Sequence, residues 1–233
     1  DFLDETDYNK VTVGNFYTTK DGITNGVNGL YSTLRGMYIQ EYLIYMCEGP
    51  SDIWIGHQGH EQWYNWTIDA TNADVRSFWY SCYKSVNQCN AVIESLENND
   101  IPGLDEDLKT RFLAESLFIR AHYFYHLVQQ FGDIPMPLKP TNSVETTAHK
   151  TKVDEVWNQI VTDLEFAVEN LPETYQASEF GHITKYAAMH HLSRVYLTLK
   201  RSDDDLKKAL NYAEQVINSG KYSLVKSHAE LWD

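Results

Sequence analysis

The residues best suited to chemistry gather between Ile53 and Ala73, where large rings alternate with amides and imidazoles. The rings are Trp54, Trp63, Tyr64 and Trp66, and the polar side chains among them are His57, Gln58, His60, Gln62 and Asn65. Aromatic faces stack on the apolar C–H faces of sugars, while amides and imidazoles hydrogen-bond hydroxyl groups. This composition is the one that a neutral saccharide site needs. The alternative is a packed loop whose rings fill a gap between helices.

From this segment the predicted ligand-binding set takes four rings and three polar side chains. They are Trp54, His60, Gln62, Trp63, Tyr64, Asn65 and Trp66.

Other motifs give no catalytic or metal site. The run His57–Glu61 has neither the HExxH nor the HxxEH order of zinc proteases. His122 and His126 are four residues apart, a spacing that can chelate zinc, but no third ligand follows at a suitable spacing. There is no GxSxG motif and no glycine-rich phosphate loop. We therefore expect no enzyme, no metal and no cofactor.

Composition limits the class of partner. The chain has 233 residues, 42% of them hydrophobic, which is enough for one large or two small cores. Its formal net charge of -14 argues against binding to nucleic acid or to an anionic membrane surface. No run reaches the roughly 18 to 20 apolar residues of a membrane span. A neutral ligand fits this charge best.

The three cysteines, Cys47, Cys82 and Cys89, suggest neither a disulfide framework nor a zinc site. Cys82 and Cys89 lie on one expected helix, about 10 Å apart along its axis, which is too far for a bond between them. We expect all three to be small core residues.

The element that must position the rest is a helix from about Phe112 to Gly132. Apolar residues occupy nearly all of its faces, which is typical of a central helix. After Gly132, Pro135 and Pro137 prevent the helix from resuming. Glu115 and Arg120 lie five residues apart inside it, so each is expected to anchor a neighbouring helix or loop rather than the other.

The same apolar spacing predicts further helices over residues 21–34, 75–96, 153–171 and 204–219, with 38–47 as a candidate extension of the first. Small residues at the expected contacts, such as Ala187, Ala188, Ala209 and Ala213, are typical of tetratricopeptide-like hairpins. The strict repeat consensus is absent. The predicted fold is all-α, with divergent tetratricopeptide-like helical hairpins and long irregular loops.

Several of these stretches resemble the SusD/RagB family. The central helix carries the main match in AESLFIRA at 114–121 and in FGDIP at 131–135. Further matches are Phe78–Trp79, Asn90, Val92–Ile93, Asp163–Glu165, Leu171–Pro172 and the region from Gly181 to Leu197.

The resemblance implies a non-catalytic, lipid-anchored protein of the outer-membrane surface that captures an oligosaccharide or polysaccharide. Its expected partner is a SusC-like TonB-dependent transporter. It also implies that residues 1–233 form the N-terminal helical-repeat domain, with the C-terminal half of the family fold absent. Asp1–Asp4 resembles the start of mature relatives just after their lipid-carrying cysteine, so the anchor is expected to be missing. The alternative function is a helical-repeat scaffold that binds a peptide or protein partner.

Overall fold

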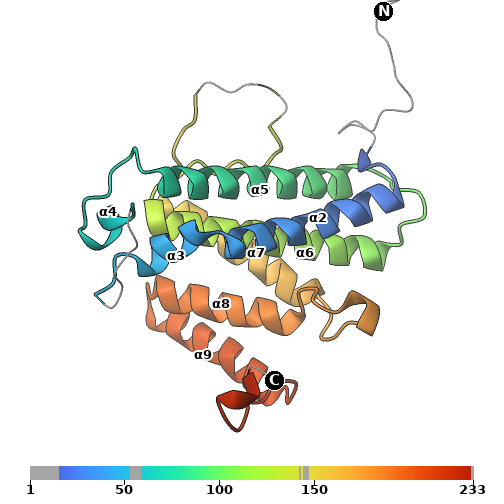
Figure 1. Ribbon diagram of the computed structural model, residues 1–233. Helices are drawn as coiled ribbons and strands as arrows, with labels where there is room; N and C mark the ends of the chain where they lie inside the picture. The colour runs from blue at the N-terminus through green and yellow to red at the C-terminus, as the bar shows by residue number, and fades with distance from the viewer. Residues whose placement is uncertain (1–15, 53–58, 142, 144–146, 232–233) are drawn as a thin grey trace, which may run out of the picture.

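The computed structural model describes residues 16–52, 59–141, 143 and 147–231, and the described part is built from helices (Figure 1). The helices, in chain order, are α2 (Lys20–Ile39), α3 (Glu41–Glu48), α4 (Glu61–Tyr64), α5 (Ala73–Asn98), α6 (Glu106–Phe131), α7 (Val153–Asn170), η1 (Ala177–Glu179), α8 (Lys185–Leu199), α9 (Asp203–Asn218) and η2 (Ala229–Leu231). Within these ranges the only β pairing is an isolated antiparallel bridge between Ile134 and Thr151.

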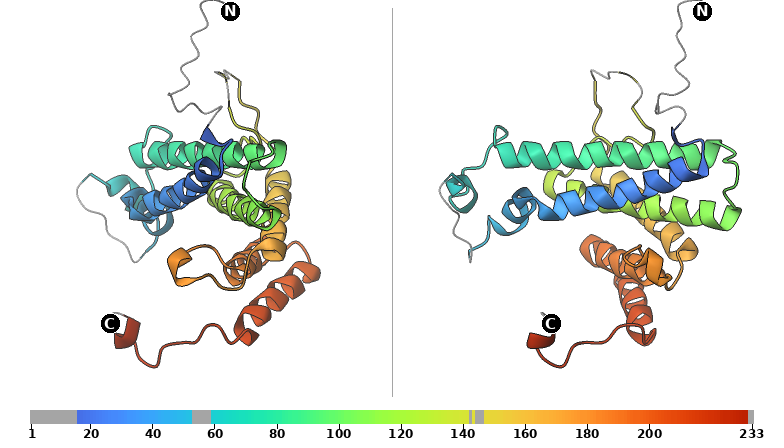
Figure 2. Two further views of the ribbon diagram at one scale, coloured as in Figure 1. Left: turned by 90° about the vertical axis from the view of Figure 1, so that its right-hand side faces the viewer. Right: turned by 45° about the vertical axis from the view of Figure 1, so that its right-hand side comes forward.

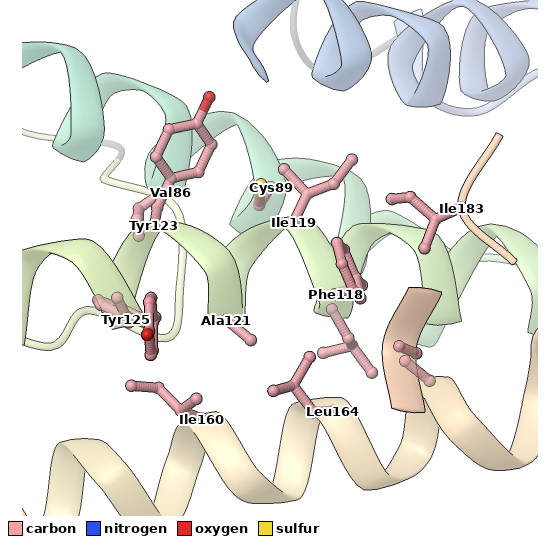
Figure 3. Close-up of a cluster of buried hydrophobic side chains, with 14 of the residues drawn as sticks. Val86, Cys89, Phe118, Ile119, Ala121, Tyr123, Tyr125, Ile160, Leu164 and Ile183 are labelled. Carbon is pink, nitrogen blue, oxygen red and sulfur yellow. The ribbon is translucent and has the colours of Figure 1, made fainter. Parts of the chain in front are cut away.

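Helix α6 is the central element. It packs against α5, α7 and α2, and its buried residues lie on every face, as the sequence pattern predicted. Figure 3 shows α6 between two neighbours, with Ile119 and Tyr123 on the side of Val86 and Cys89. On the opposite side α6 faces Ile160 and Leu164 of α7. Ile119, Ile160 and Leu164 are fully buried.

The helices succeed one another as antiparallel neighbours. The most extensive contacts join α5 with α6, α6 with α7, α7 with α8 and α8 with α9. Figure 2 shows this succession, with α9 at the far side of the stack from α5. The prediction of an all-α fold of stacked hairpins is confirmed.

Local signals explain where the helices begin and end. Thr19, Asn72 and Asp105 each accept a hydrogen bond from a backbone N–H in the first turn of α2, α5 and α6. Helix α6 ends at Gly132, whose φ of 68° lies in the region that glycine adopts at little cost. The chain then runs into Ile134, which pairs with Thr151 just before α7 begins.

Two expectations are corrected. Of the candidate extension over residues 38–47, only Tyr38 and Ile39 belong to α2, because Gln40 adopts an extended backbone and α3 begins at Glu41. Cys47 is exposed rather than part of the core, because the side of α3 that packs inward presents Tyr45 and Met46. Cys82 and Cys89 are buried and free, as predicted.

The two buried charges of α6, Glu115 and Arg120, anchor neighbouring elements, as expected. Arg120 forms a two-point ion pair with Asp163 of α7, with Nε to Oδ2 and Nη2 to Oδ1 both at 2.8 Å. Its Nη1 also donates to Asn90 of α5 at 3.1 Å. Arg120, Asp163 and Asn90 are all buried, so this contact joins three consecutive helices inside the core.

The carboxylate of Glu115 is fully buried and joins a second set of elements. Tyr31 of α2 donates to it at 2.7 Å, and Tyr175 donates at 3.3 Å. His182 Nδ1 lies 2.9 Å from the same carboxylate, and Arg111 Nε lies 3.3 Å from it. Burial, together with the Glu115 charge, raises the pKa of Tyr31 and Tyr175. Glu115 therefore attaches the segment before α8 to α2 and α6.

Three histidines meet where α6 contacts α8. The ring centroid of His122 is 4.7 Å from that of His126 and 5.1 Å from that of His191. His122 Nε2 lies 2.8 Å from the hydroxyl of Tyr38. His191 is buried, and its Nε2 has no hydrogen-bond partner. The spacing of His122 and His126 could be seen in the sequence, but the third histidine could not, because His190 and His191 are adjacent and only the fold shows that His191 is the buried one.

This cluster predicts acid sensitivity. Burial lowers the pKa of His126 to about 4 and that of His191 to about 3, and it lowers the pKa of His122 well below its usual value. The charge of Arg194 and the neighbouring histidines add to this effect. The unfolded chain, with histidine pKa values near about 6.5, therefore binds more protons than the folded chain below that pH. The free energy of unfolding should fall as the pH drops from about 6.5 towards 4.

Urea unfolding at a series of pH values measures this effect. The variant His191→Phe should flatten the loss of stability on acidification, whereas His190→Gln, at the exposed neighbouring position, should leave the pH profile of the wild type unchanged. Equal profiles for wild type and His191→Phe would contradict a role for the cluster.

Candidate functional site

The ring-rich segment begins its described part at Gly59 and is fixed to the fold by Trp63. Trp63 lies on the short helix α4 and is only 3% exposed. Its indole N–H donates to Asp74 Oδ2 at 3.1 Å, and its ring lies nearly parallel to Tyr45 of α3, with centroids 6.4 Å apart. The ring of Trp63 therefore faces the core and attaches α4 to α3 and to the first turn of α5.

His60 belongs to the same attachment. Its ring stacks on Tyr45 at a centroid distance of 4.0 Å and an interplanar angle of 17°. His60 Nδ1 lies 3.4 Å from Asp74 Oδ2, so one carboxylate holds both His60 and Trp63. Burial and the nearby Glu41 raise the pKa of Tyr45, whose hydroxyl donates to Glu41 at 3.0 Å. Two rings of the segment thus stabilise its position.

Gln62 and Asn72 link the two ends of the segment. Asn72 Nδ2 donates to Gln62 Oε1 at 2.9 Å, while Asn72 Oδ1 accepts from the backbone N–H groups of Asp74 and Val75. The same asparagine therefore caps α5 and closes the loop. Gln62 remains exposed beside this contact.

Trp66 points outward from this framework. Its side chain is 73% exposed, and its φ is 57°, a conformation that bulky residues rarely adopt. The backbone N–H of Thr67 donates to Gln62 O at 3.0 Å, and the N–H of Asn65 donates to Glu61 O at 3.0 Å. These bonds hold the turn on both sides of Trp66. A large apolar ring held in solvent by a turn that costs about 1–3 kcal/mol suggests a function for that ring.

The predicted residues thus divide into two groups. His60 and Trp63 pack against Tyr45 and contact Asp74, so they hold the loop in place. Gln62, Asn65 and Trp66 are exposed, and Tyr64 is half-buried. Trp54 lies outside the described residues. Asp74, which holds His60 and Trp63, was not among the predicted residues. Its signal was an acidic residue two positions after the capping Asn72, in the first turn of α5.

The chemistry that this arrangement offers is binding. Among the predicted site residues, the exposed groups are an indole and two amides, which carry no charge, and the half-buried phenol of Tyr64 lies among them in the chain. In the part of the chain that the structure describes, no three His, Cys, Asp or Glu side chains are placed to hold a metal ion. A neutral ligand with apolar faces and hydroxyl groups matches these groups.

The fold is a stack of helical hairpins, and one of its loops exposes an aromatic ring and two amides. These features define the class of protein as a helical-repeat binding protein. The family model that matches the chain, over residues 1–197, is described as starch-binding and associating with the outer membrane. The chain belongs to this SusD-like family. That description is one of a binding protein, in agreement with the prediction that the chain is not an enzyme.

Curated relatives extend the match over the whole chain. A SusD-like protein of Bacteroides ovatus is 24% identical over 99% of the chain, and a SusD-like protein of Formosa agariphila is 28% identical over 93% of it. The chain covers 43% of the length of each. It therefore spans less than half of the curated relatives that it matches.

Solved structures agree in fold. A laminarin-binding SusD-like protein shares 25% identity with a TM-score of 0.77, covering 93% of this chain and 48% of its own length. A structure with xylogluco-oligosaccharide aligns with a TM-score of 0.79 at 21% identity, covering 91% of this chain and 43% of its own. None of the helices in the described residues combines the length and the apolar composition that a membrane span requires.

Proposed function

We propose that the chain is the helical part of a non-catalytic surface protein that captures an oligosaccharide or polysaccharide. The observation that carries this proposal is the exposed indole of Trp66, held outward beside Asn65 by the loop that Trp63 attaches to Asp74. The indole would stack on the C–H face of a sugar ring, and the amides of Asn65 and Gln62 would hydrogen-bond its hydroxyls. Tyr64 would border this surface. Trp54 remains in the proposed set as a further ring of the same segment.

His60 and Trp63 take an indirect part in this proposal. Because both are held by Asp74, they position the loop rather than contact the sugar. The proposal is supported by the family description and by relatives whose names include laminarin and xylogluco-oligosaccharide.

Delivery is the second part of the proposal. The captured glycan would pass to a SusC-like TonB-dependent transporter in the outer membrane, where a lipid anchor would hold the protein at the cell surface. Membership of a family that associates with the outer membrane supports this location. The stacked helices would then supply the surface that docks on the transporter.

Replacing Trp66 with alanine tests glycan capture. If the indole stacks on the sugar, Trp66→Ala should weaken binding at least tenfold, about 1.4 kcal/mol, in calorimetric titrations with soluble laminarin, xyloglucan and starch oligosaccharides. The fold should persist, because the side chain is 73% exposed.

The matched control is Tyr80→Ala. Tyr80 is 68% exposed but lies on α5, outside the loop, so its removal should leave the affinity unchanged. If wild type binds a glycan and Trp66→Ala binds it equally well, the loop is not the site. Binding of a peptide pool instead of any glycan would favour the scaffold alternative.

A further inference from the structure

A hollow lies on α5, apart from the Trp66 loop. It is a cavity of about 500 Å³ between α5 and the two arms of the segment that joins α6 to α7. Figures 1 and 2 show the two arms, within residues 132–141 and 147–152, beside α5. Its described lining includes Trp79, Tyr83, Met136, Thr147, His149 and Thr151. The volume lies within the range of small-molecule pockets, about 300–1,000 Å³.

The floor of the cavity is rigid. Trp79 and Tyr83 are one helical turn apart, with ring centroids 4.7 Å from each other. Trp79 packs edge-on against Phe131 at 4.8 Å, and the Tyr83 hydroxyl donates to Pro135 O at 2.6 Å. Both rings are half-buried, so each keeps part of its surface available to the cavity.

The first wall, residues 135–141, is fastened to α5 by a row of side chains. Asn90 Nδ2 donates to Pro137 O at 2.8 Å and lies 3.3 Å from Lys139 O. Asn87 Oδ1 accepts from the backbone N–H of Thr141 at 2.7 Å. Together with Tyr83, these residues hold the wall along about two turns of α5.

The second wall, residues 147–151, is fixed where it meets the first. The Thr151 N–H donates to Ile134 O at 2.8 Å, and Ile134 N–H donates to Thr151 O at 3.2 Å. Lys152 and Asp133 close the same base with an ion pair at 2.8 Å. The cavity is therefore shaped before any ligand arrives.

The lining identifies the class of ligand. No Asp, Glu, Lys or Arg lines the described cavity, while the aromatic residues Trp79 and Tyr83, three threonines and a histidine do. This is again the combination that suits a neutral sugar. A peptide strand fits less well, because Pro135 and Pro137 in the first wall have no N–H to donate to it.

We propose that this cavity is a second binding site, for a short neutral oligosaccharide that stacks on Trp79 and Tyr83. The inference rests on the proposed function for its class of ligand but not for its position. Asp74 holds the loop that carries Trp66, and Trp79 follows Asp74 by five residues on α5. Five residues correspond to a rotation of about 140° around the helix axis, so the two sites lie on different sides of α5. Each can be changed without altering the other.

Paired variants test the proposal by titration with laminarin and xyloglucan oligosaccharides. Trp79→Leu should remove one set of binding sites and lower the measured stoichiometry, whereas Tyr80→Leu, at the exposed adjacent position, should not. If Trp79→Leu fails to fold, Ala148→Phe fills the cavity from an exposed position, and Lys150→Phe is its control outside the lining. Amide shifts of residues 147–151 on titration should locate the sugar in the wild type.

The outcomes separate the two sites. Full binding by both Trp79→Leu and Ala148→Phe, or loss of all glycan binding in Trp66→Ala alone, overturns the second site. If Trp79→Leu and Ala148→Phe lose glycan binding while Trp66→Ala keeps it, the second site is supported and the Trp66 site is overturned. If wild type binds no glycan, both proposals fail, and a peptide that shifts residues 147–151 would identify the occupant as a different class of molecule.

Discussion

Replacing Arg120 with methionine is expected to destabilise the protein by about 3–5 kcal/mol, because it leaves a buried carboxylate without its counter-charge. Asp163 is 2% exposed, and both of its oxygens are bound by the guanidinium. Burial raises the pKa of Asp163 even with Arg120 present. After the substitution, the amide of Gln159, at 2.7 Å, would be the remaining hydrogen-bond donor to Asp163 among the described residues. Asn90 would also lose the donor to its Oδ1.

Urea unfolding of Arg120→Met against wild type measures this loss. The exposed Arg76 of α5 provides the control, since Arg76→Met should change stability by less than about 0.5 kcal/mol. The double variant Arg120→Met, Asp163→Leu removes the stranded charge and should recover much of the loss. A single variant as stable as wild type would mean that the pair contributes nothing to the packing of α6 on α7.

Removal of the Glu115 carboxylate should produce the second large effect. In Glu115→Leu the hydroxyl of Tyr31 and the ring of His182 lose a partner at 2.7 Å and 2.9 Å, and Arg111 loses a nearby negative charge. Each buried group left without a partner costs about 1–3 kcal/mol, so we expect a total loss of about 3 kcal/mol. The loss should be accompanied by loosening of the segment before α8.

Thermal unfolding and limited proteolysis measure these two consequences. Glu179→Leu is the matched control, because Glu179 also binds Arg111, at 2.7 Å, but is partly exposed. An ion pair of that kind contributes only about 0–1 kcal/mol. Cleavage between residues 172 and 184 should therefore increase in Glu115→Leu and not in Glu179→Leu. Equal cleavage in both would show that Glu115 does not hold this segment.

The helices could be predicted from the sequence because their signals are local. Helix α6 ends at Gly132, as predicted, since a glycine followed closely by prolines determines the end of a helix without reference to any other segment. The roles of Glu115 and Arg120 followed from their spacing on a helix that is buried all round. Their partners did not follow, because Tyr31 and Asp163 are brought to them only by packing.

The loop was less predictable for the same reason. Trp63 and Trp66 are three residues apart in a segment with no regular period, so nothing in the sequence separates a buried ring from an exposed one. Which of them turns inward depends on Asp74, which accepts a hydrogen bond from the indole of Trp63. The cavity on α5 could not be foreseen either, because its walls come from residues 135–141 and 147–151 and its floor from Trp79 and Tyr83.

The order in which the helices stack also determines which part of the molecule opens first. Helix α9 packs mainly on α8, whereas α6 is enclosed by α2, α5 and α7. In a stack of this kind each helix is stabilised chiefly by its neighbours, so separation of the end helix breaks a single interface. The amide hydrogens of α9 should therefore exchange with solvent through local opening, while those of α6 exchange only when the whole domain unfolds.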